Sequence, residues 1–394
     1  MLNQRELFLK FVAQTSDAPL MLEIDKAEGL YLYNKKGEKY LDLISGISVS
    51  NIGHRHPIVI KAIKQQLDKY LHLMVYGEYV QQPQVKLAKK ICELLPKKLS
   101  NVYFVNSGSE AVEGALKLAK RYTKRKKIIS CSNAYHGSTH GCLSIMSDNN
   151  YKNAFGPLLP DVSHISFGNF DDLKNIKNDV ACVIIEPIQA EAGIIIPPKG
   201  YMEELYNICK KNGVLLIFDE IQTGFGRTGK MFGFENYEIV PDIITLAKGM
   251  GGGMPIGAFI SSYEIMQSLT NNPVLGHITT FGGHPVSCAA SLATINVILK
   301  NKYIEKVEEK RQLFLANLNH SKIKEIRSCG LMIALEFESF EFNKKLIDKC
   351  ISKGVITDWF LFNDKSLRIA PPLTISEKDI LFACEVINES IDEI

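Results

Sequence analysis

The residues best suited to chemistry are an aspartate and a lysine that each follow an apolar strand. In VLLIFDE, residues 214–220, Asp219 closes the run, and open α/β sheets bind ligands beyond the carboxyl ends of such strands. In IITLAKGMGGGMPIG, a strand at 243–246 leads Lys248 into a glycine-rich turn, whose backbone can approach a ligand closely. A lysine amine held there suits Schiff-base chemistry. A cap or ion-pair role for Asp219 and an exposed loop position for Lys248 are the alternatives.

A third motif, YFVNSGSEAVEGALKLAKRY, leads a strand into a helix through Ser107, Gly108 and Ser109. The free N–H groups of a helix start, together with two hydroxyls, favour a site for one phosphate group. The same residues also fit a capping box in which Ser107 pairs with Glu110. The two interpretations are compatible.

Two other patterns resemble binding motifs, but the residues around them do not fit such sites. The glycines of GFGRTG, residues 224–229, match a dinucleotide fingerprint, but an acidic pair separates them from the strand and no amphipathic helix follows. His54 with His56, and His136 with His140, have no carboxylate or cysteine at ligand spacing. We therefore predict neither a dinucleotide site nor a metal site.

These motifs need a framework that brings strand ends together. From about residue 57 apolar strands alternate with amphipathic helices, which predicts an α/β sheet, largely parallel, with crossover helices. The helices are expected at 57–71, 83–95, 109–122 and 201–211, and the strands at 101–105, 127–131, 180–185, 214–218 and 242–246. A hairpin around Lys36-Gly37 precedes them.

After Pro285 the pattern changes to a smaller α+β unit. It is expected to hold a long helical stretch at 286–317, the strands LMIALEFE and SLRIAPPL, and helices at 341–353 and 376–391. We predict a large ligand-binding domain at 57–285 and a small domain at 286–394, to which the N-terminal segment 1–56 also belongs.

Composition excludes several classes of protein. The 394 residues are 46% hydrophobic and 23% charged, with a formal net charge of +3, which fits an ordered globular chain with no field to hold nucleic acid. No apolar run reaches the roughly 18 residues of a membrane span. Nine scattered cysteines without a CxxC pair indicate reduced thiols. Charged residues interrupt the N-terminal run, so we expect an N-terminal helix rather than a signal peptide, and a cytoplasmic protein.

Taken in order, NSGSEA, AYHGS, IIEPIQAEAG, FDEIQTGFGRTG, LAKGMGGGMPIGA, TTFGGHP and LRIAPPL resemble the motifs of class III aminotransferases. The resemblance runs from about Tyr31 to Leu373 and is nearest to the acetylornithine and ornithine aminotransferase branch. It implies a pyridoxal-phosphate-dependent transferase of fold type I, with a mostly parallel seven-stranded sheet in the large domain and a smaller α+β domain. It also implies pyridoxal 5'-phosphate as cofactor.

The resemblance assigns roles around that cofactor. Lys248 binds it covalently and shuttles a proton, while Asp219 pairs with its pyridine nitrogen. The other implied positions are Ser107, Gly108 and Ser109 for the phosphate, Tyr135 and Ile221 for the two ring faces, Gln222 near the phenolic oxygen, and Glu186 and His136 behind the ring. Thr280 matches a threonine that reaches the phosphate of the neighbouring subunit, which implies a homodimer with shared active sites.

The resemblance also assigns the substrate side. Arg368 takes the α-carboxylate of glutamate or 2-oxoglutarate, Glu191 masks this arginine while an ω-amino donor is bound, and Thr279 belongs to the same pocket. Ser138 stands where related enzymes usually have an arginine that clamps the donor's distal carboxylate. Ile47 is typical of the acetylornithine group.

These features predict transfer of an ω-amino group from N-acetylornithine to 2-oxoglutarate, giving glutamate and a semialdehyde, as in arginine biosynthesis. Ornithine, 4-aminobutyrate or another amine is the alternative donor, and a pyridoxal-phosphate mutase or decarboxylase, or a non-catalytic binder, is a more distant alternative. Glu191 and Arg368 argue against a mutase, which has no second carboxylated substrate. Arg55, Lys199 or a side chain of the neighbouring subunit remain open as substitutes for the arginine replaced by Ser138.

Overall fold

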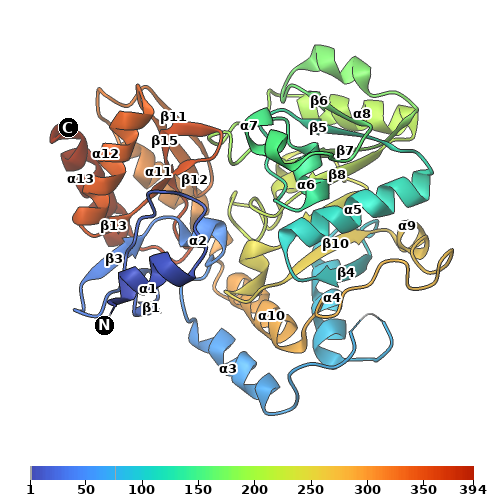
Figure 1. The fold of residues 1–394 in the computed structure, drawn as a ribbon, viewed down its shortest axis with the longest axis horizontal. Helices are drawn as coiled ribbons and strands as arrows, with labels where there is room; N and C mark the ends of the chain where they lie inside the picture. The colour runs from blue at the N-terminus through green and yellow to red at the C-terminus, as the bar shows by residue number, and fades with distance from the viewer. Residues whose placement is uncertain (1, 76) are drawn as a thin grey trace.

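A seven-stranded sheet forms the centre of the larger part of the molecule in the computed structural model, which describes residues 2–75 and 77–394 (Figure 1). The strand order is β4-β10-β9-β8-β7-β5-β6. The neighbours from β9 to β6 pair in parallel, and only β10 runs antiparallel to the strands on either side. The strands are β4 (Asn101–Val105), β5 (Lys127–Cys131), β6 (Val162–Ile165), β7 (Val180–Ile185), β8 (Leu215–Asp219), β9 (Ile243–Leu246) and β10 (Gly257–Ser261). The mostly parallel seven-stranded sheet is confirmed.

Helices cover the sheet because its central strands are apolar on both faces. Every residue of β7, β8, β9 and β10 is buried, as expected for the strands of a sheet that lies between two helical layers. On one face α5 (Gly108–Thr123) packs against β9 and β10, and Gly114 permits this approach because a Cβ there would meet the Phe259 ring at 2.3 Å. The other surrounding helices are α3 (Pro57–Leu67), α4 (Gln82–Leu94), α8 (Tyr201–Asn212) and α10 (Pro285–Lys300).

The smaller part combines both ends of the chain. One sheet has the order β1-β2-β3-β13, in which β3 (Lys39–Asp42), near the start of the chain, pairs in parallel with β13 (Val355–Ile356), near its end. A second sheet has the order β11-β12-β15-β14, and α11 (Val307–Asn317), α12 (Phe340–Ser352) and α13 (Glu377–Asp392) pack beside it (Figure 1). The remaining strands are β1 (Lys26–Glu28), β2 (Tyr31–Tyr33), β11 (Glu325–Cys329), β12 (Met332–Glu336), β14 (Asp358–Phe360) and β15 (Asn363–Ile369). The domain boundaries at 56/57 and 285/286 stay predictions.

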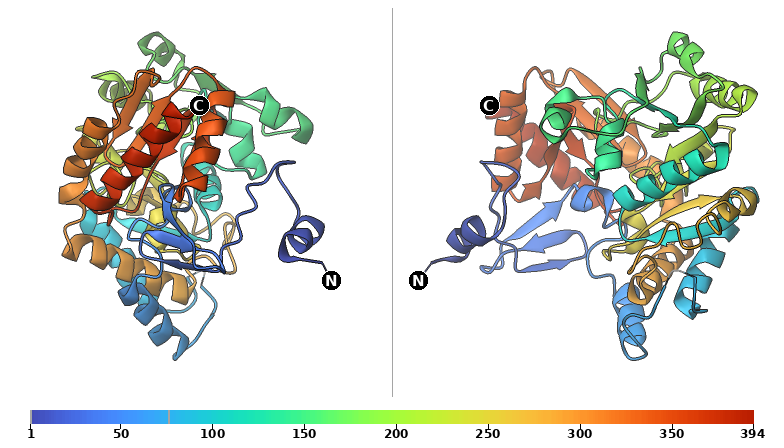
Figure 2. Two further views of the ribbon diagram at one scale, coloured as in Figure 1. Left: turned by 90° about the vertical axis from the view of Figure 1, so that its left-hand side faces the viewer. Right: turned by 45° about the vertical axis from the view of Figure 1, so that its right-hand side comes forward.

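The N-terminal segment joins this smaller part through a shared core. Leu41 and Leu43 are fully buried in one cluster with Leu346 and Ile387. The predicted hairpin is confirmed, since Tyr31 faces Leu41 and Tyr33 faces Lys39 across β2 and β3. Before it, α1 (Gln4–Phe11) projects from the body of the chain with no buried residue (Figure 2).

Two helical predictions in the sequence are wrong in extent. The stretch expected at 286–317 is two helices, because α10 ends at Lys300 and α11 begins at Val307, with Lys302 between them at a φ of +54°. The first helix, expected to reach residue 71, ends at Leu67. Short strands such as β6 and β14 were not predicted at all. Within the described residues, no helix combines the length and the apolar composition needed to cross a membrane.

Candidate active site

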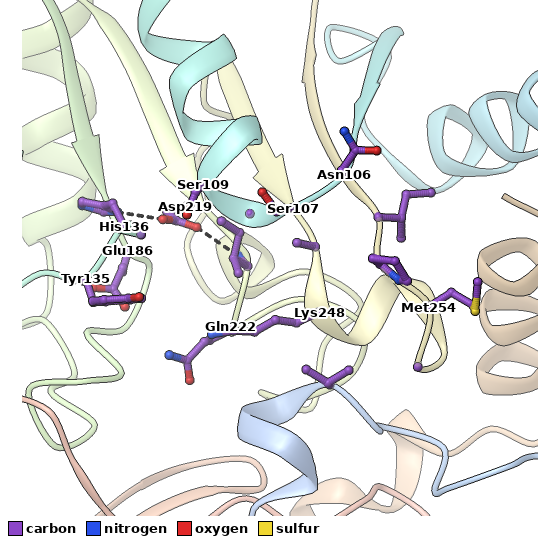
Figure 3. A pocket seen from close by; sticks show the side chains of 18 residues that line it. Asn106, Ser107, Ser109, Tyr135, His136, Glu186, Asp219, Gln222, Lys248 and Met254 are labelled. Carbon is purple, nitrogen blue, oxygen red and sulfur yellow. Dashed lines mark hydrogen bonds and ion pairs between the residues drawn. The ribbon is translucent and has the colours of Figure 1, made fainter. Parts of the chain in front are cut away.

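The carboxyl ends of five strands meet around a cavity of about 440 Å³ (Figure 3). Because β4, β5, β7, β8 and β9 all point the same way, the loops that follow them converge at one edge of the sheet. The lining includes ten residues singled out in the sequence, namely Ser107, Gly108, Ser109, Tyr135, His136, Glu186, Asp219, Ile221, Gln222 and Lys248.

Asp219 is held rigidly at the floor of this cavity. It ends β8, is 3% exposed, and its Oδ2 lies 2.7 Å from Nδ1 of His136. Its Oδ1 accepts hydrogen bonds from the Ile221 N–H at 3.1 Å and the Thr245 hydroxyl at 3.2 Å. Three donors therefore fix the carboxylate in one orientation. Burial alone would lower the pKa of His136, but the hydrogen bond and charge of Asp219 raise it above its usual value.

A second carboxylate, Glu186, lies in the same buried layer. It follows β7 and accepts hydrogen bonds from the backbone N–H groups of Tyr135 at 3.2 Å and Ala190 at 3.0 Å. Burial raises the pKa of Glu186 to about 7, the neighbouring charge of His136 opposes the rise, and Asp219 adds to it. The layer behind the cavity thus contains two carboxyl groups and one imidazole.

The start of α5 opens onto the cavity. Ser107 caps the helix by accepting a hydrogen bond from the Glu110 N–H at 3.2 Å. The reciprocal half of the expected capping box is wrong, because the Glu110 carboxylate bonds to the Asn106 N–H at 2.8 Å instead of to Ser107. The first N–H groups of a helix have no acceptor within it, so this end of α5 suits a phosphate group.

Gly137 is a position that sequence reasoning missed. Its φ is +120°, and a Cβ there would lie 2.2 Å from Oγ of Ser109. Only glycine lets the loop that carries Tyr135 and His136 pack this tightly on α5. The glycine in AYHGS was a visible signal for such an approach.

Lys248 stands between this cavity and a second one. It opens the turn after β9 with a φ of +46°, a conformation that costs energy for a residue with a side chain. Burial lowers the pKa of Lys248 to about 8, with Glu191 opposing and Arg368 adding to the effect. About a tenth of this amine is therefore unprotonated at pH 7, far more than for an ordinary lysine, and the unprotonated form is the nucleophile.

The second cavity, of about 450 Å³, contains three of the five predicted substrate residues, Ile47, Glu191 and Arg368. Its lining is Gly46, Ile47, Tyr135, Glu191, Lys248, Trp359, Leu361 and Arg368. Glu191 and Arg368 form a bidentate pair there, with Nη1 to Oε1 at 2.9 Å and Nη2 to Oε2 at 2.8 Å. Both side chains are buried. Burial would raise the pKa of Glu191, but Arg368 overcomes it and lowers the value to about 2.

Gln222 links the two cavities. It lines the first, and its Nε2 donates a hydrogen bond to Oε1 of Glu191 at 2.8 Å. Ser138 is exposed, with its hydroxyl 3.1 Å from the Tyr135 hydroxyl. Arg55 and Lys199 line neither cavity.

Three predicted residues, Ser138, Thr279 and Thr280, line neither cavity. Thr280 is exposed, and Thr279 accepts a hydrogen bond from the side chain of Asn106 at 3.0 Å. Trp359 and Leu361 line the second cavity although the sequence did not single them out. They lie on or beside β14, whose three residues are too short for a recognisable strand pattern.

The GFGRTG segment has a structural role. It forms turns rather than a helix, and Arg227 within it is fully buried. Its guanidinium donates hydrogen bonds to the Leu331 carbonyl at 3.1 Å and to Oδ1 of Asn51 at 2.6 Å. The segment therefore joins the larger part of the molecule to the smaller one.

Comparison with known proteins agrees with this arrangement. A family model described as aminotransferase class-III matches residues 11–391. A transaminase from the marine bacterium Virgibacillus is 28% identical, with a TM-score of 0.93 over 99% of this chain and 98% of that one. An adenosylmethionine-8-amino-7-oxononanoate aminotransferase from Methanocaldococcus jannaschii is 31% identical, with a TM-score of 0.92 over 99% and 98% of the two chains. An ornithine aminotransferase from Toxoplasma gondii, with pyridoxal phosphate at its active site, is 29% identical, with a TM-score of 0.92 over 98% of this chain and 93% of that one.

Proposed function

The chain belongs to the class III aminotransferases, which use pyridoxal 5'-phosphate, and from that premise we propose that it transfers an ω-amino group to 2-oxoglutarate. N-acetylornithine is the leading donor, and the products are glutamate and a semialdehyde. The observation that carries the proposal is the buried pair of Glu191 and Arg368 in a cavity that Lys248 also lines.

The residues of the first cavity fit the cofactor. When bound, pyridoxal phosphate withdraws electrons from the reacting carbon and carries the amino group between two substrates. A helix start with two serines suits its phosphate, the fixed carboxylate of Asp219 suits a protonated ring nitrogen, and Lys248 offers an amine for covalent attachment. Tyr135 and Ile221 supply apolar walls, with Gln222, Glu186 and His136 around them.

Lys248 then acts as the proton carrier of both half-reactions. With a substrate amine in its place on the cofactor, Nζ of Lys248 would be free to accept a proton from the reacting carbon and to return it. A pKa of about 8 suits both directions, because it lies closer to neutral pH than that of an ordinary lysine.

Glu191 and Arg368 give the two substrates one common pocket. An ω-amino donor has no carboxylate on its reacting carbon, and Glu191 stays paired with the Arg368 guanidinium while such a donor is bound. A 2-oxo acid presents its own carboxylate, which offers the guanidinium the same bidentate geometry. This exchange explains how one site accepts two unlike substrates.

The same proposal includes a homodimer. Thr280 lies on an exposed loop with four exposed apolar side chains, Val274, Leu275, Ile278 and Phe281. A second copy of the chain would cover such a surface, and Thr280 would then reach the partner's phosphate site.

One observation favours a second class of donor. Among the described residues that line the two cavities, Lys248 and Arg368 are the only lysine and arginine, and Arg368 is paired. Ser138 offers no charge to a distal carboxylate, whereas Ile47, Trp359 and Leu361 offer apolar surface. A carboxylate-free amine is therefore the alternative donor.

Half-reactions with single donors test the proposal. The yellow enzyme is mixed in turn with N-acetylornithine, ornithine, 4-aminobutyrate, lysine and a simple diamine, and the cofactor absorption is followed until 2-oxoglutarate restores it. Bleaching by N-acetylornithine at low concentration supports the leading donor, and bleaching by the diamine alone supports the second class. The absence of bleaching with any amine contradicts transamination.

Ser138→Arg is the matched variant for the donor. It places a cation at position 138, where related enzymes usually have one. The variant should raise kcat/KM for N-acetylornithine by about tenfold and leave kcat/KM for the diamine unchanged. An equal change in kcat/KM for N-acetylornithine and for the diamine would show that position 138 does not contact the donor's distal carboxylate.

A further inference from the structure

Three consecutive residues of β14 hold the side chain of Arg368. Oδ1 of Asp358 lies 3.0 Å from Nε of the arginine, and the Trp359 carbonyl accepts a hydrogen bond from Nη2 at 2.9 Å. The guanidinium carbon lies 4.5 Å from the centre of the Phe360 ring, within the range of a cation–π contact. Neither this segment nor Asp358 was among the residues expected to form the site.

The contact with Asp358 is built into the sheet. Asp358 and Arg368 are directly opposite each other in the antiparallel pair of β14 and β15, and such neighbours project from the same face. The register shifts one residue later, between Trp359 and Phe360, and the Phe360 ring also reaches the guanidinium.

The carboxylates of Glu191 and Asp358 contact different nitrogen atoms of the Arg368 guanidinium. Glu191 takes Nη1 and Nη2, the forked edge that recognises carboxylates, and Asp358 faces Nε. The Asp358 contact is an ion pair without an aligned hydrogen bond among the described residues. Asp358 therefore leaves the forked edge open to exchange, while it stays close enough to compensate the charge.

Asp358 keeps its own charge near neutral pH. Burial raises the pKa of Asp358 to about 6, Arg368 opposes the rise, and Glu191 and Asp42 add to it. At neutral pH the group is mostly ionised.

We propose that Asp358 is a positioning residue that orients Arg368 and serves as its counter-ion while Glu191 gives way to the 2-oxo acid. The inference rests on the proposed role of Arg368. A buried guanidinium without a carboxylate partner is strongly disfavoured, so release of Glu191 into an unpaired state would oppose the exchange. With Asp358 in place, Arg368 retains one carboxylate throughout, and its forked edge keeps its direction.

Asp358→Asn tests this because it removes the charge and keeps the shape. In the holoenzyme at neutral pH, the second-order rate constant for 2-oxoglutarate in the oxo-acid half-reaction should fall about tenfold, with the amine half-reaction within about twofold of wild type. Asp364→Asn is the matched control, because Asp364 is exposed on β15. It should change neither half-reaction.

A binding measurement supports the kinetic one. Glutarate, a dicarboxylate that cannot react, should bind about tenfold more weakly to Asp358→Asn than to wild type. Trp359 is the only tryptophan of the chain and lines the cavity, so its fluorescence can report this binding. Asp358→Ser, assayed in the same way, replaces the asparagine variant if that one fails to fold.

The outcomes separate the inference from the function on which it rests. If Arg368→Lys leaves the oxo-acid half-reaction intact, the proposed role of Arg368 is wrong and the role of Asp358 falls with it. If Arg368→Lys abolishes that half-reaction but Asp358→Asn behaves as wild type, only the role of Asp358 is wrong. Equal slowing of both half-reactions by Asp358→Asn would assign Asp358 to general packing and would also overturn the inference.

Discussion

The two cavities differ in how their charged groups are held. In the first, Asp219 receives three hydrogen bonds and Glu186 receives two from backbone N–H groups, all from adjacent parallel strands or from the segments that follow them. In the second, Glu191 and Arg368 are 177 residues apart and hold each other, in a contact that, under the proposed function, a substrate carboxylate replaces. The first arrangement is suited to a cofactor that stays bound through both half-reactions, and the second to substrates that bind and leave in turn.

This difference predicts which half-reactions each residue affects. Changes in the first cavity should impair the amine and the oxo-acid half-reactions together, because both depend on the same cofactor. Changes in the second should impair one half-reaction more than the other. The three substitutions below test that distinction, beginning with the largest expected effect.

Lys248→Ala should cause the largest loss. Without the amine there is no covalent attachment and no proton carrier, so we expect kcat to fall by about 10⁴-fold or more in both half-reactions. Borohydride reduction followed by mass spectrometry should show the cofactor adduct on wild type and not on the variant. Lys230→Ala, at an exposed lysine, is the control and should retain both the adduct and the activity. Substantial turnover by Lys248→Ala would remove Lys248 from the mechanism.

Asp219→Asn should cost about 10²- to 10³-fold in kcat, again in both half-reactions, because it removes a preorganised charge from the floor of the cavity. Cofactor affinity should change far less than kcat, since the phosphate site at the start of α5 is untouched. Equilibrium titration of the apoenzyme with pyridoxal phosphate, beside single-turnover rates, separates the two quantities. A loss confined to one half-reaction would contradict the assignment of Asp219 to the shared cofactor.

The first cavity was more accessible to sequence reasoning than the second. Asp219 and Lys248 could be singled out because each follows a buried strand, and strands of one direction end at one edge of a sheet. The start of α5 was visible as a strand followed by NSGSE. Local sequence therefore predicts the positions where the cofactor fits.

The second cavity depends on contacts that local sequence does not encode. The pairing of Glu191 with Arg368 was expected only through resemblance to a family, since nothing in their spacing brings them together. Asp358 was missed because β14 has only three residues, and its alignment with Arg368 depends on the register of an irregular pairing with β15, which shifts between Trp359 and Phe360. The break near Lys302 was missed for a related reason, because neither glycine nor proline marks it in LKNKYIEK.

Glu191→Gln should have the smallest effect and the most selective one. Glutamine keeps the size and loses the charge that lets Glu191 compete with a substrate carboxylate for Arg368, so glutamate should react more readily and a carboxylate-free amine less readily. We expect the ratio of their kcat/KM values to shift by about tenfold toward glutamate. Glu203→Gln, at an exposed position on α8, should leave the ratio unchanged. If Glu191→Gln slows both substrates equally, the pair is a fixed structural contact, and the second cavity is held as rigidly as the first.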